Sequence, residues 1–156
     1  MFELKKTVAL VGMMGSGKSA IGKVISSILD VPFNDADIEI ERAAKLSIPE
    51  IFERHGEKFF RDKEDQVIKR LLKERPCVLA TGGGAFINTK IRTTIKQYGV
   101  SVWLNADIET LWNRVKHKRS RPLLRTDNPR QTLTHIYTDR IETYSLADVT
   151  IESQGK

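Results

Sequence analysis

The stretch Gly12-Met13-Met14-Gly15-Ser16-Gly17-Lys18-Ser19 decides the fold. It fits the pattern G-x-x-x-x-G-K-[ST], the phosphate-binding P-loop. Before it, Thr7–Val11 is a short apolar run typical of a buried strand, and apolar residues recur at helical spacing after it, at Ile21, Val24, Ile25, Ile28 and Leu29. The flanking strand and helix disfavour the alternative, a glycine-rich turn without a ligand.

The P-loop predicts which residues bind a nucleotide. Its glycines let consecutive backbone N–H groups converge on an anion, and the N-terminus of the following helix adds positive potential. Lys18 is expected to reach the β- and γ-phosphates of ATP, and the Ser19 hydroxyl is expected to bind Mg²⁺. The ATP-binding residues expected here are Gly12, Gly15, Ser16, Gly17, Lys18, Ser19 and Ala20.

Length and composition indicate one globular domain over residues 1–156, with 40% hydrophobic and 29% charged residues. No apolar run reaches the length of a membrane span, and Met1–Lys6 has no signal-peptide core. The single cysteine, Cys77, excludes an internal disulfide and suits a reducing cytosol. We therefore expect a cytoplasmic protein that does not bind a membrane.

The net charge of the chain is +6, and one segment, Arg114–Arg125, carries six cationic residues and no acidic one, so the rest of the chain is close to neutral. The segment has no aromatic side chain that could stack on bases, so nucleic acid is not the expected partner. We expect its cations to face the phosphates of a bound nucleotide, with a solvated charged face as the alternative. The aperiodic part, at about residues 117–128, is expected to form a lid over them.

Apolar runs and helical patterns alternate along the chain, which predicts an α/β fold with a mostly parallel sheet and helices on both faces. The expected strands are Thr7–Val11, Val31–Ala36, Cys77–Thr81, Val100–Leu104 and Ala147–Ile151. The expected helices are Lys18–Leu29, Ile38–Lys45, Ile48–Arg54, Glu57–Leu72, Lys90–Tyr98, Asp107–Val115 and Pro129–Tyr144.

Three charged residues lie on or beside the apolar stripes of these helices. Glu64 lies on the stripe of the helix Glu57–Leu72, Arg61 lies at its edge, and Arg140 falls within the stripe of the last helix. A charge that faces inward is costly unless it is paired or lines a wet cavity. One explanation is internal salt bridges or snorkelling arginines. The other is that the two arginines bind a substrate carboxylate while Glu64 orients an arginine or a substrate hydroxyl.

Two further motifs follow predicted strands. Ligands of open α/β sheets bind at the carboxyl ends of strands, so Asp35 and Asp37 are expected to face the phosphate site. We expect Asp35 to bind Mg²⁺ through water and Asp37 to contact the hydroxyl that attacks the γ-phosphate, although either could instead cap the next helix. The third strand ends in Gly82-Gly83-Gly84, which indicates a close approach of backbone to a ligand.

Together these motifs resemble the shikimate kinases, in the nucleoside-monophosphate-kinase-like group of P-loop kinases. The resemblance covers nearly the whole chain and rests on the P-loop, D-A-D at Asp35–Asp37, F-F-R-D-K-E at Phe59–Glu64, T-G-G-G at Thr81–Gly84 and R-P-L-L at Arg121–Leu124. It implies a three-layer P-loop kinase fold with five parallel strands in the order 2-3-1-4-5, and a substrate-binding insert at about residues 37–64. It also implies transfer of the ATP γ-phosphate to the 3-hydroxyl of shikimate, in aromatic amino-acid biosynthesis.

The resemblance also implies residue roles. Lys18, Asp37 and Arg121 would be catalytic, with Arg121 reaching from the lid to the transferring phosphate, and Arg114 would stack on adenine. Arg61 and Arg140 would bind the shikimate carboxylate, while Asp37 would bind its hydroxyls, either as a general base or by positioning alone. The complete set expected to bind shikimate is Asp37, Phe52, Phe60, Arg61, Glu64, Gly82, Gly83, Gly84 and Arg140.

Relatives usually continue past the fifth strand with a loop that closes on adenine and a final helix, whereas this sequence ends at Lys156. We therefore expect weaker nucleotide affinity or lower stability than in a longer relative. A monomer is expected, because no helix pattern shows a second apolar face. The alternative functions are a gluconate kinase of the same group, a nucleoside monophosphate kinase and a non-catalytic ATP-binding module.

Overall fold

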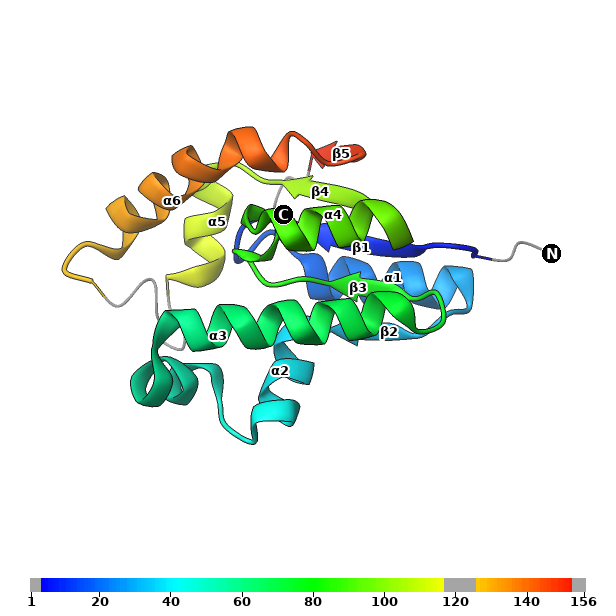
Figure 1. Cartoon of the computed structure of the whole chain (residues 1–156). Coiled ribbons are helices and arrows are strands. Elements are labelled where there is room, and N and C mark those ends of the chain that lie inside the picture. Colours follow the sequence, from blue (N-terminus) through cyan, green and yellow to red (C-terminus); the bar gives the residue numbers. More distant parts are fainter. Residues whose placement is uncertain (1–3, 117–125, 153–156) are drawn as a thin grey trace.

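Five parallel strands form the middle layer of the molecule (Figure 1). The computed structural model describes residues 4–116 and 126–152. The strands are β1 (Thr7–Val11), β2 (Phe33–Asp35), β3 (Val78–Ala80), β4 (Gly99–Asn105) and β5 (Val149–Glu152). Their order is β2-β3-β1-β4-β5 and every neighbouring pair is parallel. This confirms the α/β fold and the strand order.

Helices cover both faces of the sheet. They are α1 (Lys18–Leu29), α2 (Ala36–Ala44), α3 (Ile48–Lys73), α4 (Thr89–Tyr98), α5 (Ile108–Val115) and α6 (Pro129–Tyr144), with a short 3₁₀ helix η1 (Ala85–Ile87). In Figure 1, α1 lies behind the sheet and α4 in front of it. Behind the sheet, Ile21 and Ile25 of α1 pack on Leu10, Val102 and neighbouring strand residues. The larger core, on the other face, includes Ile68 of α3 and Ile91 of α4.

Several element ends differ from the predicted ones by one or two residues, and three differences have a clear physical reason. The predicted helices Ile48–Arg54 and Glu57–Leu72 are parts of one element, α3, bent at Gly56 where φ is 86° and ψ is 173°. The second strand is three residues long, because the Asp35 side chain accepts from the backbone N–H groups of Asp37 and Ile38 and thereby starts α2 early. The 3₁₀ helix η1 was not predicted, since three residues are too few to show a period.

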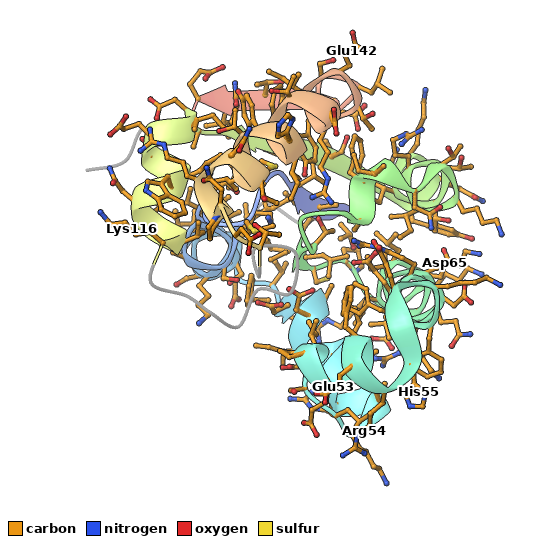
Figure 2. All side chains as sticks on the ribbon, turned by 90° about the vertical axis from the view of Figure 1, so that its left-hand side faces the viewer. Glu53, Arg54, His55, Asp65, Lys116 and Glu142 are labelled. Carbon is orange, nitrogen blue, oxygen red and sulfur yellow. The ribbon has the colours of Figure 1, made fainter. Side chains whose placement is uncertain are left out.

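The carboxyl ends of the strands meet at one end of the molecule, on the left of Figure 1, and this end faces the viewer in Figure 2. The turn bearing Glu53, Arg54 and His55 and the end of α5 at Lys116 lie on opposite sides of this end (Figure 2). Most of the predicted lid, including Arg121, lies outside the described residues. No helix in the described part of the chain combines the length and the hydropathy needed to cross a membrane.

Candidate active site

The P-loop has the backbone form that anion binding requires. Gly12, Gly15 and Gly17 have φ angles of 143°, 82° and 96°, which side-chain-bearing residues rarely adopt. Gly12 also has no room for a side chain, since a Cβ there would lie 2.7 Å from the Leu104 carbonyl oxygen. The Lys18 Nζ donates to the carbonyls of Gly12 (2.7 Å) and Met13 (3.0 Å), so the lysine is held over the loop.

The first cavity, of about 430 Å³, lies over the P-loop. It is lined by the loop residues 14–20 together with Asp35, Asp37, Ala80, Thr81, Gly82, Gly83 and Arg114. The Arg114 Nη1 donates to the Gly15 carbonyl at 2.8 Å, which ties α5 to the loop. The structure therefore brings the expected nucleotide-binding residues of the described part of the chain to one place, apart from Gly12, which does not line this cavity.

The Ser19 hydroxyl donates to Asp35 Oδ2 at 2.8 Å, so the two side chains expected to bind magnesium lie together. The other carboxylate oxygen of Asp35 accepts from the N–H groups of Asp37 (3.0 Å) and Ile38 (3.4 Å). Asp35 therefore caps α2, as one interpretation of the sequence allowed. No group of three or more His, Cys, Asp or Glu side chains within residues 4–116 and 126–152 could hold a metal by itself. Two hard oxygen ligands fit a magnesium ion that takes its remaining ligands from nucleotide phosphates and water.

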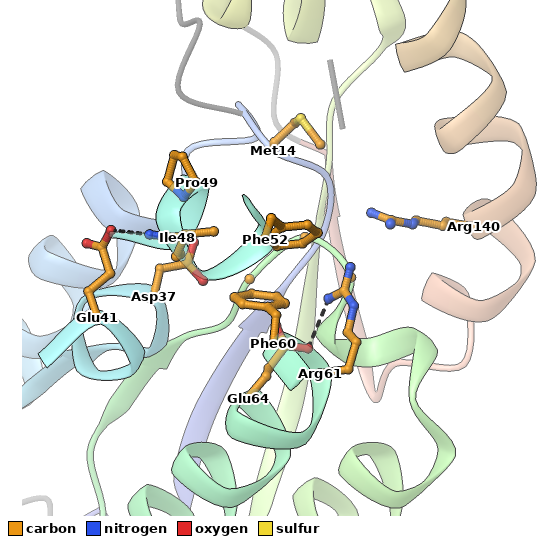
Figure 3. Close-up of a pocket in the computed structure, with 13 residues that line it drawn as sticks. Met14, Asp37, Glu41, Ile48, Pro49, Phe52, Phe60, Arg61, Glu64 and Arg140 are labelled. Atoms are coloured by element: carbon orange, nitrogen blue, oxygen red, sulfur yellow. Dashed lines mark hydrogen bonds and ion pairs between the residues drawn. The ribbon is translucent and has the colours of Figure 1, made fainter. Parts of the chain in front are cut away.

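The second cavity, of about 240 Å³, is drawn in Figure 3. Its apolar wall includes Phe52 and Phe60, whose ring centroids lie 4.9 Å apart. Arg61 and Arg140 approach from one side and Asp37 lies on the other (Figure 3). An apolar slot with cations at one end and a carboxylate at the other matches a small ring that carries an anion and hydroxyl groups.

The three inward charges predicted from the helix stripes have different surroundings. Arg61 donates to Glu64 Oε1 at 3.0 Å and forms a longer ion pair with Glu57 at 3.4 Å. Glu64 is fully buried, and this burial raises the pKa of its carboxyl group against the opposing charge of Arg61. The salt-bridge explanation therefore describes Arg61 and Glu64.

Arg140 is not explained by a salt bridge. Its Nη1 is buried and makes no hydrogen bond to any residue that the structure describes, and the same holds for Glu64 Oε2. A buried guanidinium nitrogen that lacks an acceptor is costly, and an anion bound beside it would remove that cost. The position of Arg140 at the cavity wall therefore favours an anionic ligand there.

Gly82, Gly83 and Gly84 each adjoin a different part of the site. A Cβ on Gly82 would lie 2.8 Å from Asp37 Oδ1 and 3.0 Å from Glu64 Oε2, and a Cβ on Gly84 would lie 2.6 Å from both terminal nitrogens of Arg61. A Cβ on Gly83 would lie 3.4 Å from the Met14 backbone nitrogen and 3.6 Å from Arg140 Nη1. The glycines therefore let the acidic group, the arginines and the P-loop approach one stretch of backbone.

The two cavities share part of their wall. Met14, Asp37, Gly82 and Gly83 line both of them. A ligand in the second cavity would therefore lie next to phosphates bound over the P-loop, with Asp37 at the junction. This arrangement can bring a hydroxyl group to a phosphoryl group.

Some residues of the second cavity were not predicted from the sequence: Met14, Glu41, Ile48 and Pro49. Glu41 lies one helical turn after Asp37, and its Oε2 accepts from the Ile48 N–H at 2.8 Å, which joins α2 to the start of α3. The i, i+4 spacing of Asp37 and Glu41 was a usable signal, because such residues share a helix face.

The family model, the sequence relatives and the structures that match at 28–38% identity are shikimate kinases. A family model described as shikimate kinase matches residues 14–156. A shikimate kinase of Ruegeria pomeroyi is 58% identical over 153 residues, which are 98% of this chain and 78% of that protein. One of Cereibacter sphaeroides is 57% identical over 98% of this chain and 77% of its own length. The structure of a shikimate kinase from Acinetobacter baumannii in complex with shikimate matches with a TM-score of 0.96 and 38% identity, over 99% of this chain and 87% of that one.

Proposed function

The chain belongs to the shikimate kinase family, and from this premise we propose how its residues divide the reaction. The protein transfers the γ-phosphate of ATP to the 3-hydroxyl of shikimate, giving shikimate 3-phosphate and ADP. The observation that supports the proposed roles is the wall of Met14, Asp37, Gly82 and Gly83 shared by the two cavities. ATP occupies the cavity over the P-loop and shikimate occupies the one between α3 and α6.

In this proposal the arginines recognise the shikimate carboxylate. Arg140 supplies the buried nitrogen that has no acceptor within residues 4–116 and 126–152, and Arg61, held by Glu64, supplies the second guanidinium group. Guanidinium groups bind carboxylates in a bidentate manner, which fixes the orientation of the ring as well as its position. Phe52 and Phe60 cover the ring, and Gly82, Gly83 and Gly84 form the wall against which it rests.

Asp37 then receives the opposite, hydroxyl-bearing side of the ring. It accepts a hydrogen bond from the 3-hydroxyl and points a lone pair of that oxygen toward the γ-phosphorus. The P-loop amides, Lys18 and Arg121 neutralise charge on the phosphoryl oxygens, which is the main requirement of phosphoryl transfer. Arg114 holds the base side of the nucleotide, and its bond to Gly15 keeps it beside the loop.

Mg²⁺ is the proposed cofactor, held by the Ser19 hydroxyl and, through water, by Asp35. When bound with ATP it would neutralise charge on the β- and γ-phosphates.

We also propose a monomeric cytoplasmic enzyme without a nucleic-acid partner, because both substrates are small and the two cavities lie within one chain. Val24 and Ile28 are exposed on α1, so light scattering at several concentrations is the measurement that tests the monomer.

The test is ADP release in a coupled assay with MgATP and shikimate, gluconate or no acceptor. We expect turnover with shikimate alone and none in Lys18→Ala. Arg140→Ala should raise the KM for shikimate, while Asp37→Asn should mainly lower kcat. Arg130→Ala is the matched control, because Arg130 lies on the same helix but pairs with the exposed Glu109. An unchanged KM for shikimate in Arg140→Ala would contradict its role.

A further inference from the structure

Tyr144 is the largest fully buried side chain among the described residues, and none of the proposed roles in binding or catalysis involves it. It is the last residue of α6, one helical turn after Arg140, so the two side chains share a helix face. Its ring stacks on Trp103 of β4, with centroids 5.7 Å apart and planes 29° apart. The ring is therefore held between α6 and the sheet, and the direction of its hydroxyl group is set.

The hydroxyl group ends at the wall shared by the two cavities. It donates to the carbonyl oxygen of Gly83, a residue 61 positions earlier in the chain, and lies 3.8 Å from the Met13 sulfur in the P-loop. Burial raises the pKa of the Tyr144 hydroxyl, against the effect of the nearby Arg140 charge, so the group stays protonated and remains a donor. One side chain thus joins α6, the glycine loop and the P-loop.

The bond to Gly83 has a consequence for the next residue. A peptide unit is planar, and its C=O and N–H point in opposite directions. Fixing the Gly83 carbonyl therefore fixes the direction of the Gly84 N–H. It also fixes the path of this loop, which leaves no room for a side chain between Gly84 and Arg61 and passes near Arg140 at Gly83. Without the donor, the peptide could rotate and both arginines would lose a fixed neighbour.

We propose that Tyr144 is a positioning residue of the kinase, whose hydroxyl group holds the Gly83 peptide and so sets the shape of the shikimate cavity. The inference rests on the proposed roles of Arg61 and Arg140. Tyr137 on the same helix provides the contrast, because it is only partly buried and its hydroxyl donates to Asn105 Oδ1 at 3.1 Å, where neither residue lines either of the two cavities.

The experiment compares Tyr144→Phe with Tyr137→Phe on the same helix, each of which loses one hydroxyl hydrogen bond. We expect Tyr144→Phe to raise the KM for shikimate about tenfold, the effect typical of a lost buried hydrogen bond, and Tyr137→Phe to leave it within about twofold. The KM is informative because a smaller folded fraction lowers the apparent kcat but not the KM. A Tyr144→Phe protein with lower thermal stability and the wild-type KM would overturn the proposal.

If Tyr144→Phe does not fold, two amino acids that retain the ring shape separate the donor from packing. With 4-aminophenylalanine at position 144 the donor is kept and a KM near that of the wild type is expected. With 4-methylphenylalanine it is lost and the KM should rise. An equal rise in both would overturn the proposal. Two controls are measured alongside: turnover of the wild type with shikimate, and the KM for shikimate of Arg140→Ala. If the wild type turns over shikimate and Arg140→Ala has a raised KM, the proposed function holds and an unchanged KM in the Tyr144 variants counts against this inference alone.

Discussion

At the scale of single residues, Glu64 combines features that oppose each other. It is fully buried, it pairs with Arg61 at 3.0 Å through one oxygen, and its other oxygen has no hydrogen-bond partner among the described residues. Burial raises its pKa above the ordinary 4.5 and outweighs the charge of Arg61. The folded protein therefore binds this proton more tightly than the unfolded chain does.

This makes a prediction about stability and pH. A raised folded-state pKa contributes stability that is complete below pH 4.5 and is lost as the pH rises through the folded-state pKa. We compare the free energy of unfolding of the wild type and Glu64→Gln in urea, without shikimate, from pH 4.5 upward. The wild type should lose stability relative to the variant, by up to about 1.4 kcal/mol per pH unit. A wild-type advantage that grows with pH would show that the pair with Arg61 dominates instead.

Gly84 gives a second prediction at this scale. A methyl group there would lie 2.6 Å from both terminal nitrogens of Arg61, so Gly84→Ala must displace the guanidinium group. Arg61 is the flexible end of a side chain, so we expect little loss of thermal stability but a KM for shikimate raised about tenfold, as for one lost charge-assisted contact. The control is Arg61→Ala, in which the added Gly84→Ala should have almost no further effect. Additive effects in the double variant would contradict this explanation.

At the scale of elements, the bend in α3 shapes the second cavity, the proposed shikimate site. Gly56 has φ 86° and ψ 173°, and a Cβ there would meet nothing within 4 Å, so only the backbone conformation requires glycine. The bend lies between Phe52 and Phe60, whose rings meet at 4.9 Å. A straight helix would place these rings two turns apart on one surface instead of against each other.

Gly56→Ala therefore tests the bend. Backbone strain of this kind costs about 1–3 kcal/mol. For a domain of this size that corresponds to a melting temperature lower by roughly 2–10 °C. We also expect a higher KM for shikimate, measured at a temperature where circular dichroism shows the variant folded. Glu53→Ala, one turn earlier and exposed, is the control and should change neither. A melting temperature of Gly56→Ala equal to that of the wild type would mean that the bend tolerates a side chain.

At the scale of the whole molecule, the two cavities open beside each other and share the wall that contains Asp37. With the proposed occupants, ATP and shikimate would be bound at the same time and the phosphoryl group would pass directly between them. We expect double-reciprocal plots that intersect, as direct transfer in a ternary complex requires. No burst of ADP should appear when shikimate is omitted. Parallel lines, with a phosphorylated protein detected by mass spectrometry, would indicate an enzyme-bound intermediate and contradict direct transfer.

Much of this protein follows from local signals in its sequence. The bounds of α1 and α6 are those expected from apolar spacing and from Asn128-Pro129, because periodicity and capping act within a few residues. The P-loop and the break at Gly56 are also local, since the first is encoded by closely spaced glycines and the second by a single glycine. Glu64 and Arg140 were identified as misplaced charges on apolar stripes, which shows that a breach of a local pattern can mark a site.

The tertiary structure decided what depends on distant pairings. The sequence could not show that Arg61 is held by a salt bridge while Arg140 Nη1 lacks an acceptor among the described residues, because the partners of both arginines are set by distant packing and not by their positions on the helix stripes. Nor could it show that Tyr144, an ordinary core position by its spacing, donates to Gly83. Residues as far apart as Met14 and Gly83 form one wall only when parallel strands bring their carboxyl ends to one edge of the sheet.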